Sequence, residues 1–138
     1  LAVSLHAAND AARNKLMGCN KKWPIRDIFD AVQIYYLKTA NRVTFEYIMI
    51  KGVNDSEDDA DDLCELLKGV KCNVNLIEYN AHPGCRLKAS DARTIKRFAG
   101  MLKKAGVETV IRYKRGRQIN AACGQLGADW LKNSNPKS

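Results

Sequence analysis

A histidine, an asparagine and a cysteine stand where their side chains could do chemistry. His6 directly follows a short apolar segment, where an imidazole could donate or accept a hydrogen bond, although a single histidine there is commonly only a hydrogen-bonded neighbour. Asn80 also follows an apolar segment, and it could either bind a ligand through its amide or form an Asx-turn. Cys123 lies beyond a basic stretch that would favour a nucleophilic thiolate, although a cysteine between alanine and glycine is ordinarily a packing residue.

The cysteines predict no metal site in this chain. The five cysteines, at positions 19, 64, 72, 85 and 123, show neither C-x-x-C nor C-x-x-x-C-x-x-C spacing. Their odd number, with no signal peptide and no long apolar run, favours a reducing compartment, so we expect a cytoplasmic protein that does not enter the membrane. The phosphate-loop, dinucleotide-binding, zinc-protease and nucleophile-elbow patterns do not occur either.

Positive charge is concentrated in the second half of the chain. The 138 residues carry 23 bases and 15 acids, a net charge of +8, and seven of the acids lie between positions 55 and 65. Residues 86–117 hold eleven bases and two acids and end in RYKRGR, which is typical of a surface that contacts phosphates. A solvated helix face followed by a charged loop would look the same. Composition alone therefore leaves nucleic-acid binding open.

The elements that position these residues alternate between strand and helix. Apolar and β-branched runs predict buried strands, and apolar residues at helical spacing predict amphipathic helices. The acids at 55–65 sit at the start of one such helix, where its dipole favours negative charge, so they need no catalytic or metal role. The strands are expected at 1–5, 43–50, 74–79 and 107–113. Three helices are expected: one at 25–41, one that follows an N-cap at Ser56, and one that runs from an N-cap at Ser90 to a stop at Gly106.

This alternation predicts an α/β fold with a parallel sheet and right-handed crossovers. Ligands bind such sheets at the carboxyl ends of the strands, so residues 4–6, 51–52 and 80–84 are expected on one edge. Four parallel strands could stand alone or form part of a barrel. Because the first strand begins without a preceding turn or cap, we favour the barrel.

Several stretches together resemble one family. They are residues 4–7 (SLHA), 20–22, 42–47, 52–55 (GVND), 75–77, 80–84 and 121–126 (AACGQL). In order and spacing they are similar to RlmN, a radical S-adenosylmethionine methyltransferase that modifies carbon 2 of an adenosine in 23S ribosomal RNA and in some transfer RNAs. The resemblance runs from residue 1 to about residue 130. It implies the carboxyl half of a partial (βα)6 radical-SAM barrel over residues 1–106, with a closing strand and a cysteine-bearing segment over 107–138.

The resemblance also implies site residues and cofactors. S-Adenosylmethionine would be contacted by Ser4, Leu5, His6 and Asn80. Cys123 matches the cysteine that takes a methyl group from one S-adenosylmethionine, while a second is cleaved at a [4Fe-4S] cluster to a radical that activates the S-methyl group. An adenine carbon is a poor nucleophile and a thiolate is a good one, so a methyl-carrying cysteine suits this target.

RNA is the partner that the resemblance implies. The basic run would then face RNA phosphates, and the residues nearest Cys123 in sequence are Arg112, Lys114, Arg115 and Arg117. The family's cluster-binding motif does not occur in these 138 residues, so we expect this chain alone not to turn over. Unpaired edges of an open half-barrel also favour self-association. Two alternatives remain open: a Cfr-type methyltransferase that targets carbon 8, and a basic RNA-binding module without catalysis.

Overall fold

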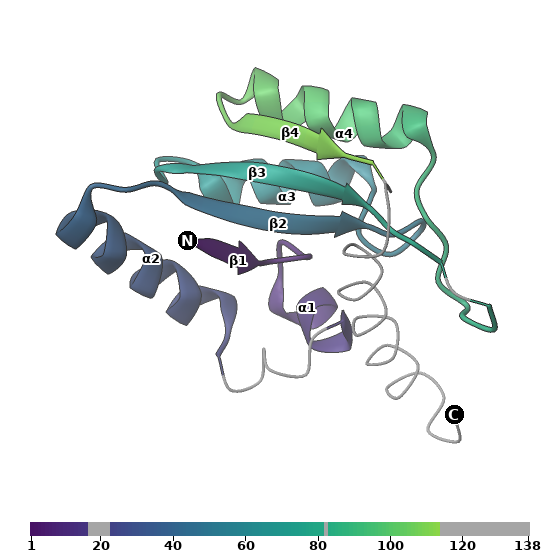
Figure 1. Cartoon of the computed structure of the whole chain (residues 1–138), viewed down its shortest axis with the longest axis horizontal. Coiled ribbons are helices and arrows are strands. Elements are labelled where there is room, and N and C mark those ends of the chain that lie inside the picture. Colours follow the sequence, from purple (N-terminus) through teal and green to yellow (C-terminus); the bar gives the residue numbers. More distant parts are fainter. Residues whose placement is uncertain (17–22, 82, 114–138) are drawn as a thin grey trace.

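The protein forms an α/β fold around a single parallel sheet (Figure 1). The structure, a computed structural model, describes residues 1–16, 23–81 and 83–113. The strands β1 (Ala2–Ser4), β2 (Val43–Met49), β3 (Cys72–Glu78) and β4 (Glu108–Arg112) lie in the order β1-β2-β3-β4, and each pairs in parallel with the next. Between them run α1 (Asp10–Leu16), α2 (Ile25–Thr39), α3 (Glu57–Leu67) and α4 (Ala92–Lys104). The predicted fold class is confirmed.

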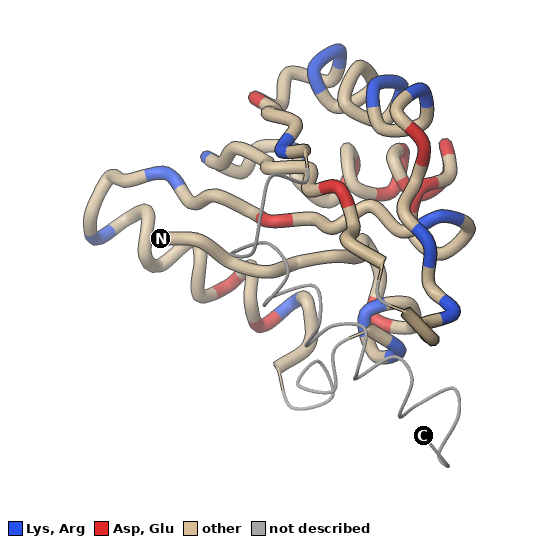
Figure 2. Tube along the Cα trace, turned by 45° about the vertical axis from the view of Figure 1, so that its right-hand side comes forward, with Lys and Arg blue, Asp and Glu red and all other residues tan. Residues whose placement is uncertain are grey.

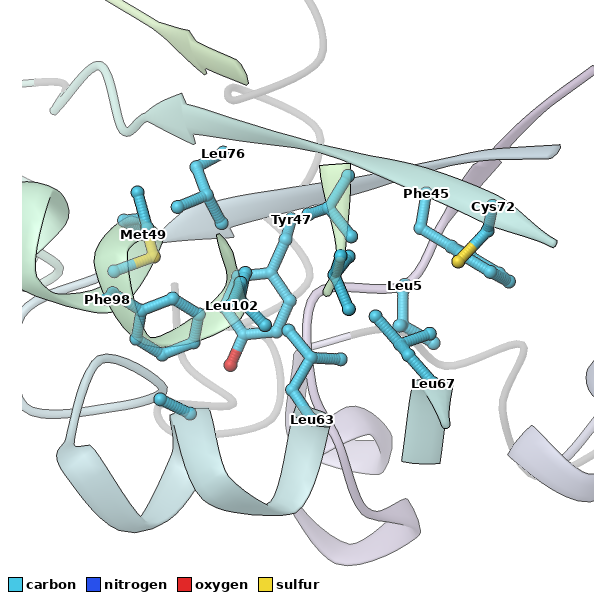
Figure 3. Packing of buried hydrophobic residues seen from close by; sticks show 14 of the residues in the cluster. Leu5, Phe45, Tyr47, Met49, Leu63, Leu67, Cys72, Leu76, Phe98 and Leu102 are labelled. Atoms are coloured by element: carbon cyan, nitrogen blue, oxygen red, sulfur yellow. The ribbon is translucent and has the colours of Figure 1, made fainter. Parts of the chain in front are cut away.

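The main core lies between the sheet and its three longer helices. Alternate residues of β2, among them Phe45 and Tyr47, point to this side and pack against the buried faces of α2, α3 and α4 (Figure 3). The ring centroids of Tyr47 and Phe98 of α4 are 5.2 Å apart, and those of Phe45 and Phe29 of α2 are 5.0 Å apart. All three helices therefore cover one face of the sheet, as right-handed crossovers require.

The opposite face of the sheet is more polar. Thr44 and Glu46 of β2 and Asn73 and Asn75 of β3 are half-buried there, and the Thr44 hydroxyl donates to Oδ1 of Asn73 at 3.1 Å. Towards the carboxyl ends of the strands a second apolar cluster replaces these side chains. It consists of Leu16, Ile48, Ile50, Tyr79 and Leu87. The candidate site lies at this end.

The sequence located most elements, and the structure corrects three points. The helix before β4 is capped by Asp91, whose carboxylate accepts from the Thr94 N–H at 2.7 Å, and not by Ser90. Ser90 instead donates its hydroxyl to Oδ2 of Asp55 at 2.7 Å. Residues 1–5 do not form a buried strand: β1 is exposed or half-buried, because within the described residues it pairs with β2 alone. The short helix α1 was not expected at all.

Helix α3 forms where the acids predicted it. Ser56 accepts from the Asp59 N–H at 3.0 Å while the Asp59 carboxylate accepts from the Ser56 N–H at 3.1 Å, which makes a complete capping box. The acids therefore stabilise a helix start, as expected. No helix in the described part of the chain is long and apolar enough to cross a membrane.

Candidate functional site

The carboxyl ends of the strands meet along one edge of the sheet. β1 leads into Leu5 and His6, β2 into a turn that ends at Asn54, and β3 into Tyr79 and Asn80. Neighbouring strands are about 5 Å apart, so the residues that follow β1 and β3 are separated by roughly 10 Å across β2. The structure thus places the predicted residues His6 and Asn80 on the same edge of the sheet.

Arg13 of α1 holds the backbone at the end of β1. Its side chain is 2% exposed, and it donates from Nε to the Leu5 carbonyl at 3.0 Å and from Nη2 to the Ser4 carbonyl at 2.9 Å. A planar guanidinium with several donors in a fixed geometry suits this task. Arg13 could not be recognised from the sequence, because an arginine in a short polar segment is typical of an ordinary surface residue.

Asn54 fixes the other side of the same segment. Its Nδ2 donates to the His6 carbonyl at 2.8 Å and to the Ile48 carbonyl at 2.7 Å, while its Oδ1 accepts from the Ile50 N–H at 2.8 Å. The Tyr47 hydroxyl, buried in the core, donates to the Asn54 carbonyl at 2.6 Å. Asn54 is 1% exposed and joins the ends of β1 and β2. From the sequence, Asn54 was singled out only as part of the GVND stretch that resembles RlmN.

His6 is held as a neutral side chain with one free donor. Its backbone adopts a φ of +59°, a left-handed conformation that is uncommon outside glycine, and its Nδ1 accepts from the Ile48 N–H at 3.0 Å. Burial, with a smaller effect from the positive charge of Arg13, lowers the pKa of His6 from 6.5 to about 3. The single ring proton is therefore on Nε2, which has no partner among the described residues.

The backbone groups of Leu5 and His6 are already hydrogen-bonded. The N–H groups of Leu5 and His6 both donate to the Glu46 carbonyl, at 2.8 and 3.3 Å, and the carbonyls of Ser4, Leu5 and His6 accept from Arg13 or Asn54. The Leu5 side chain is fully buried in the main core. The backbone groups of Leu5 and the carbonyls of Ser4 and His6 are thus already occupied, and the Leu5 side chain lies in the core rather than at the edge.

Asn80 completes the edge on the β3 side. It is 9% exposed, and its amide has no hydrogen-bond partner among the described residues. Buried polar groups in native proteins normally find a partner, so this amide is available to a ligand or to an ordered water. Arg112, the last residue of β4, lies next along this edge and is exposed. The predicted residues Lys114, Arg115, Arg117 and Cys123 lie outside the described residues.

A hollow elsewhere on the molecule does not involve these residues. A cavity of about 450 Å³ lies at the amino ends of the strands and is lined by Arg42, Lys71, Cys72 and Gly106, among others. This cavity is not a candidate site, since ligands of parallel sheets bind at the opposite ends of the strands.

The chain is similar to known RNA methyltransferases over nearly its whole length. No family model matches it. A protein of Chelativorans sp. named dual-specificity RNA methyltransferase RlmN is 51% identical over 127 residues, which cover 91% of this chain and 31% of that protein. A protein of the same name from Phenylobacterium zucineum is 51% identical over 130 residues, which cover 94% of this chain and 34% of that protein. The resemblance to RlmN is confirmed. The chain spans about a third of the length of these relatives.

Solved structures agree with the match to RlmN. A radical SAM methyltransferase from Sphaerobacter thermophilus superposes with a TM-score of 0.84 at 45% identity, over 91% of this chain and 37% of that one. A domain of a pyruvate-formate lyase-activating enzyme from Bacteroides vulgatus superposes with a TM-score of 0.64 at 14% identity, over 80% of this chain and 65% of that one. The second match shows a shared fold alone, and both are consistent with the expected partial barrel.

The cofactors of RlmN fit this chain to different extents. S-Adenosylmethionine carries carboxylate, ribose and adenine groups, and the edge offers two buried, unpartnered polar groups to it, the His6 Nε2–H and the Asn80 amide. The described residues therefore fit this cofactor. They do not fit the iron–sulfur cluster, because within residues 1–16, 23–81 and 83–113 no three His, Cys, Asp or Glu side chains gather as metal ligands. We assign no step to the cluster.

Proposed function

We propose that this chain is the carboxyl-terminal part of an RNA methyltransferase of the RlmN type. The complete protein would methylate carbon 2 of an adenosine in 23S ribosomal RNA and in some transfer RNAs. The observation that carries the proposal is the 51% identity to RlmN over 127 residues of this chain. Because the chain spans a third of such proteins, the activity is proposed for the whole protein, and we expect the chain alone not to turn over.

S-Adenosylmethionine is proposed to bind at the edge formed by the ends of β1 and β3. When bound, it supplies the methyl group. The His6 Nε2–H would donate to an acceptor of the cofactor, the Asn80 amide would donate or accept, and the Ser4 hydroxyl would lie beside them. Since the pKa of His6 is about 3, its ring stays neutral at physiological pH and serves as a fixed donor rather than as an acid or base.

Arg13 and Asn54 would serve this site through the backbone. They occupy the carbonyls of Ser4, Leu5 and His6, so these groups do not need a ligand to satisfy them. The segment is therefore already in one conformation before the cofactor binds, which lowers the entropy cost of binding.

Cys123 is proposed to carry the methyl group before it reaches the RNA, and Arg112, Lys114, Arg115 and Arg117 are proposed to contact RNA phosphates. A thiolate attacks a sulfonium methyl group readily, whereas the target carbon of adenine does not. Basic residues close to Cys123 in sequence would favour its thiolate form and would attract the phosphate backbone.

Peptide mass spectrometry tests this proposal. The full-length protein that carries this segment would be purified anaerobically and analysed at Cys123 with and without added S-adenosylmethionine, beside the variants Cys123→Ala and Cys64→Ala. We expect a methyl group on Cys123, loss of RNA methylation in Cys123→Ala, and retention in Cys64→Ala, since Cys64 lies at the opposite end of the strands.

Two results would change the assignment. An unmodified Cys123 in a protein with an intact cluster would overturn the methyl-carrier mechanism and would favour a basic RNA-binding module. Mapping of the modified nucleoside to carbon 8 rather than carbon 2 would assign a Cfr-type enzyme.

A further inference from the structure

The outer face of α4 is a continuous basic surface. Helical spacing places its cations on one side, opposite the side that Ile95, Phe98 and Leu102 bury in the core. All of these cations are exposed, and Figure 2 shows them spaced along this helix at the top of the molecule. We call this surface the α4 basic face. It consists of Arg93, Lys96, Arg97, Lys103 and Lys104.

The charges of the α4 basic face are not neutralised within the described protein. The helix contains no acidic residue, and no salt bridge joins its cations to a carboxylate in the described part of the chain. The N-cap Asp91 interacts with one of them: hydrogen bonds from Thr94 and, to a smaller extent, the charges of Lys51 and Arg93 lower the pKa of its carboxyl. Arg93 and Arg97 stand four residues apart, a spacing at which like charges repel along a helix. The face is therefore unfavourable for the isolated fold.

A glycine lies in the middle of the α4 basic face. Gly100 is exposed and has helical neighbours on both sides, where alanine would be the better helix former. A Cβ added at Gly100 would meet no atom of the described protein within 4 Å. Packing inside the protein thus gives no reason for glycine. Close approach of an external group to the helix backbone, between flanking cations, would give one.

We propose that the α4 basic face binds the phosphate backbone of the RNA substrate. This inference rests on the proposed function and adds a second contact surface to the segment around Arg112. The helix is 13 residues long, so it extends for roughly 20 Å, enough to follow several phosphates. Its first turn adjoins the candidate site, since Ala89 bridges to Ile50 and Ser90 bonds to Asp55. RNA that reaches the site can therefore continue along α4.

The neighbouring helix sets a boundary to this surface. α3 packs beside α4, and its eleven residues include acids but no base. These carboxylates repel phosphate, so the RNA would follow α4 without crossing α3. Contacts of this kind position RNA and carry no sequence information, and they weaken as salt rises.

The test measures RNA binding by the full-length protein over a range of salt concentrations. The probe is a transcribed 23S ribosomal RNA fragment that contains the target adenosine. The test variant is Lys96→Gln/Lys103→Gln, and the matched control is Arg26→Gln/Lys38→Gln, which removes the same charge from exposed positions on α2. We expect the slope of log K against log salt to fall by about 1.5 in the test variant, at 0.7 to 0.9 per lost contact, and to stay unchanged in the control.

Gly100→Ala separates binding from folding. Alanine should raise the thermal stability of the protein and yet weaken RNA binding severalfold, because its methyl group occupies the space proposed for the phosphate. A purely structural α4 would gain stability without any loss of RNA affinity, and that result would overturn the proposal.

Other outcomes are also decisive. Equal changes of slope in the test variant and in the α2 control would show an effect of net charge alone and would overturn the proposal. A change in the oligomeric mass of the RNA-free protein on Lys96→Gln/Lys103→Gln would also overturn the proposal, because it would show that the α4 basic face contacts a second copy of this protein. If the unchanged protein methylates the RNA while the slopes do not move, only this inference fails; if it neither binds nor methylates RNA, the proposed function fails with it.

Discussion

Two buried asparagines at the candidate site have opposite environments. Asn54 makes three side-chain hydrogen bonds to the ends of β1 and β2, whereas the Asn80 amide makes none among the described residues. A hydrogen bond that satisfies buried backbone groups stabilises the fold, while an unpartnered buried amide does not. Asn54 therefore holds the fold together, whereas the Asn80 side chain is available for the proposed ligand.

We predict that Asn54→Ala and Asn80→Ala differ in stability. Asn54→Ala should lower the free energy of unfolding by about 3 kcal/mol, because it leaves two carbonyls and one N–H buried without partners. Asn80→Ala should leave the unfolding free energy nearly unchanged and should weaken S-adenosylmethionine binding by the full-length protein about tenfold, the equivalent of one hydrogen bond. Urea unfolding and calorimetric titration measure the two effects. Equal destabilisation by both variants would contradict this division.

His6 makes the stability of the fold depend on pH. The unfolded chain binds a proton with the ordinary pKa of 6.5, whereas the folded protein binds it only near pH 3. The stabilising contribution is therefore complete above pH 6.5 and is lost as the pH falls. Between pH 7.5 and pH 5 we expect a loss of about 2 kcal/mol in the free energy of unfolding.

The variant His6→Asn is the control for this pH dependence. Asparagine tolerates the positive φ of position 6 and does not titrate. Unfolding by urea at a series of pH values should show the acid-side loss in the unchanged protein and little of it in the variant. A loss of the same size in both would assign the effect to other groups.

Helix starts show how far local chemistry determines an element. The Ser56–Asp59 capping box forms as the sequence indicates, but the adjacent residues Ser90 and Asp91 offer two competing caps for α4. Asp91 caps the helix because Ser90 is drawn into a hydrogen bond with Asp55, distant in sequence. Local patterns thus locate a helix start to within a residue, and tertiary contacts select the capping side chain.

The cap of α3 should contribute measurably to stability. We predict that Ser56→Ala lowers the free energy of unfolding by about 1 kcal/mol, because the Asp59 N–H loses its acceptor, whereas Ser56→Gly costs only a few tenths. Thermal and urea unfolding of the three proteins measure this. Equal losses in the alanine and glycine variants would contradict this and would point instead to the hydrogen bond that the Ser56 hydroxyl donates to the Asp59 carboxylate at 2.8 Å.

Within the described part of the chain, β1 is an edge strand with one unpaired side. The Thr44 N–H donates to the Leu1 carbonyl and the Leu5 N–H donates to the Glu46 carbonyl, so the backbone of Val3 also faces β2 and the N–H of Ala2 points to the open edge. An unpaired strand edge is a template for pairing with another chain. The 138-residue chain is therefore expected to self-associate through β1.

Ala2→Pro tests this edge without breaking a bond between β1 and β2. Sedimentation velocity should show concentration-dependent association of the unchanged chain and less association of Ala2→Pro, since proline has no N–H to donate. Ala2→Thr keeps the N–H and should associate as the unchanged chain does. A monomer at every concentration would refute the prediction.

Short-range patterns were enough to predict the architecture. Apolar periodicity, the cap at Ser56 and the stop at Gly106 predict three helices between four strands, and helical crossovers require those strands to be parallel. Parallel strands put His6 and Asn80 on one edge. The helix α1 escaped prediction because its seven residues, DAARNKL, carry no apolar stripe long enough to recognise.

Only the folded chain shows what each residue at that edge does. The Leu5 side chain lies in the core. His6 forms hydrogen bonds with Ile48 and Asn54, which are 42 and 48 positions away in the sequence. Such partners depend on strand register and on the depth at which α1 packs, which no local pattern encodes. Burial also decides that His6 is neutral, since the pKa of an imidazole follows its desolvation and not its neighbours in sequence.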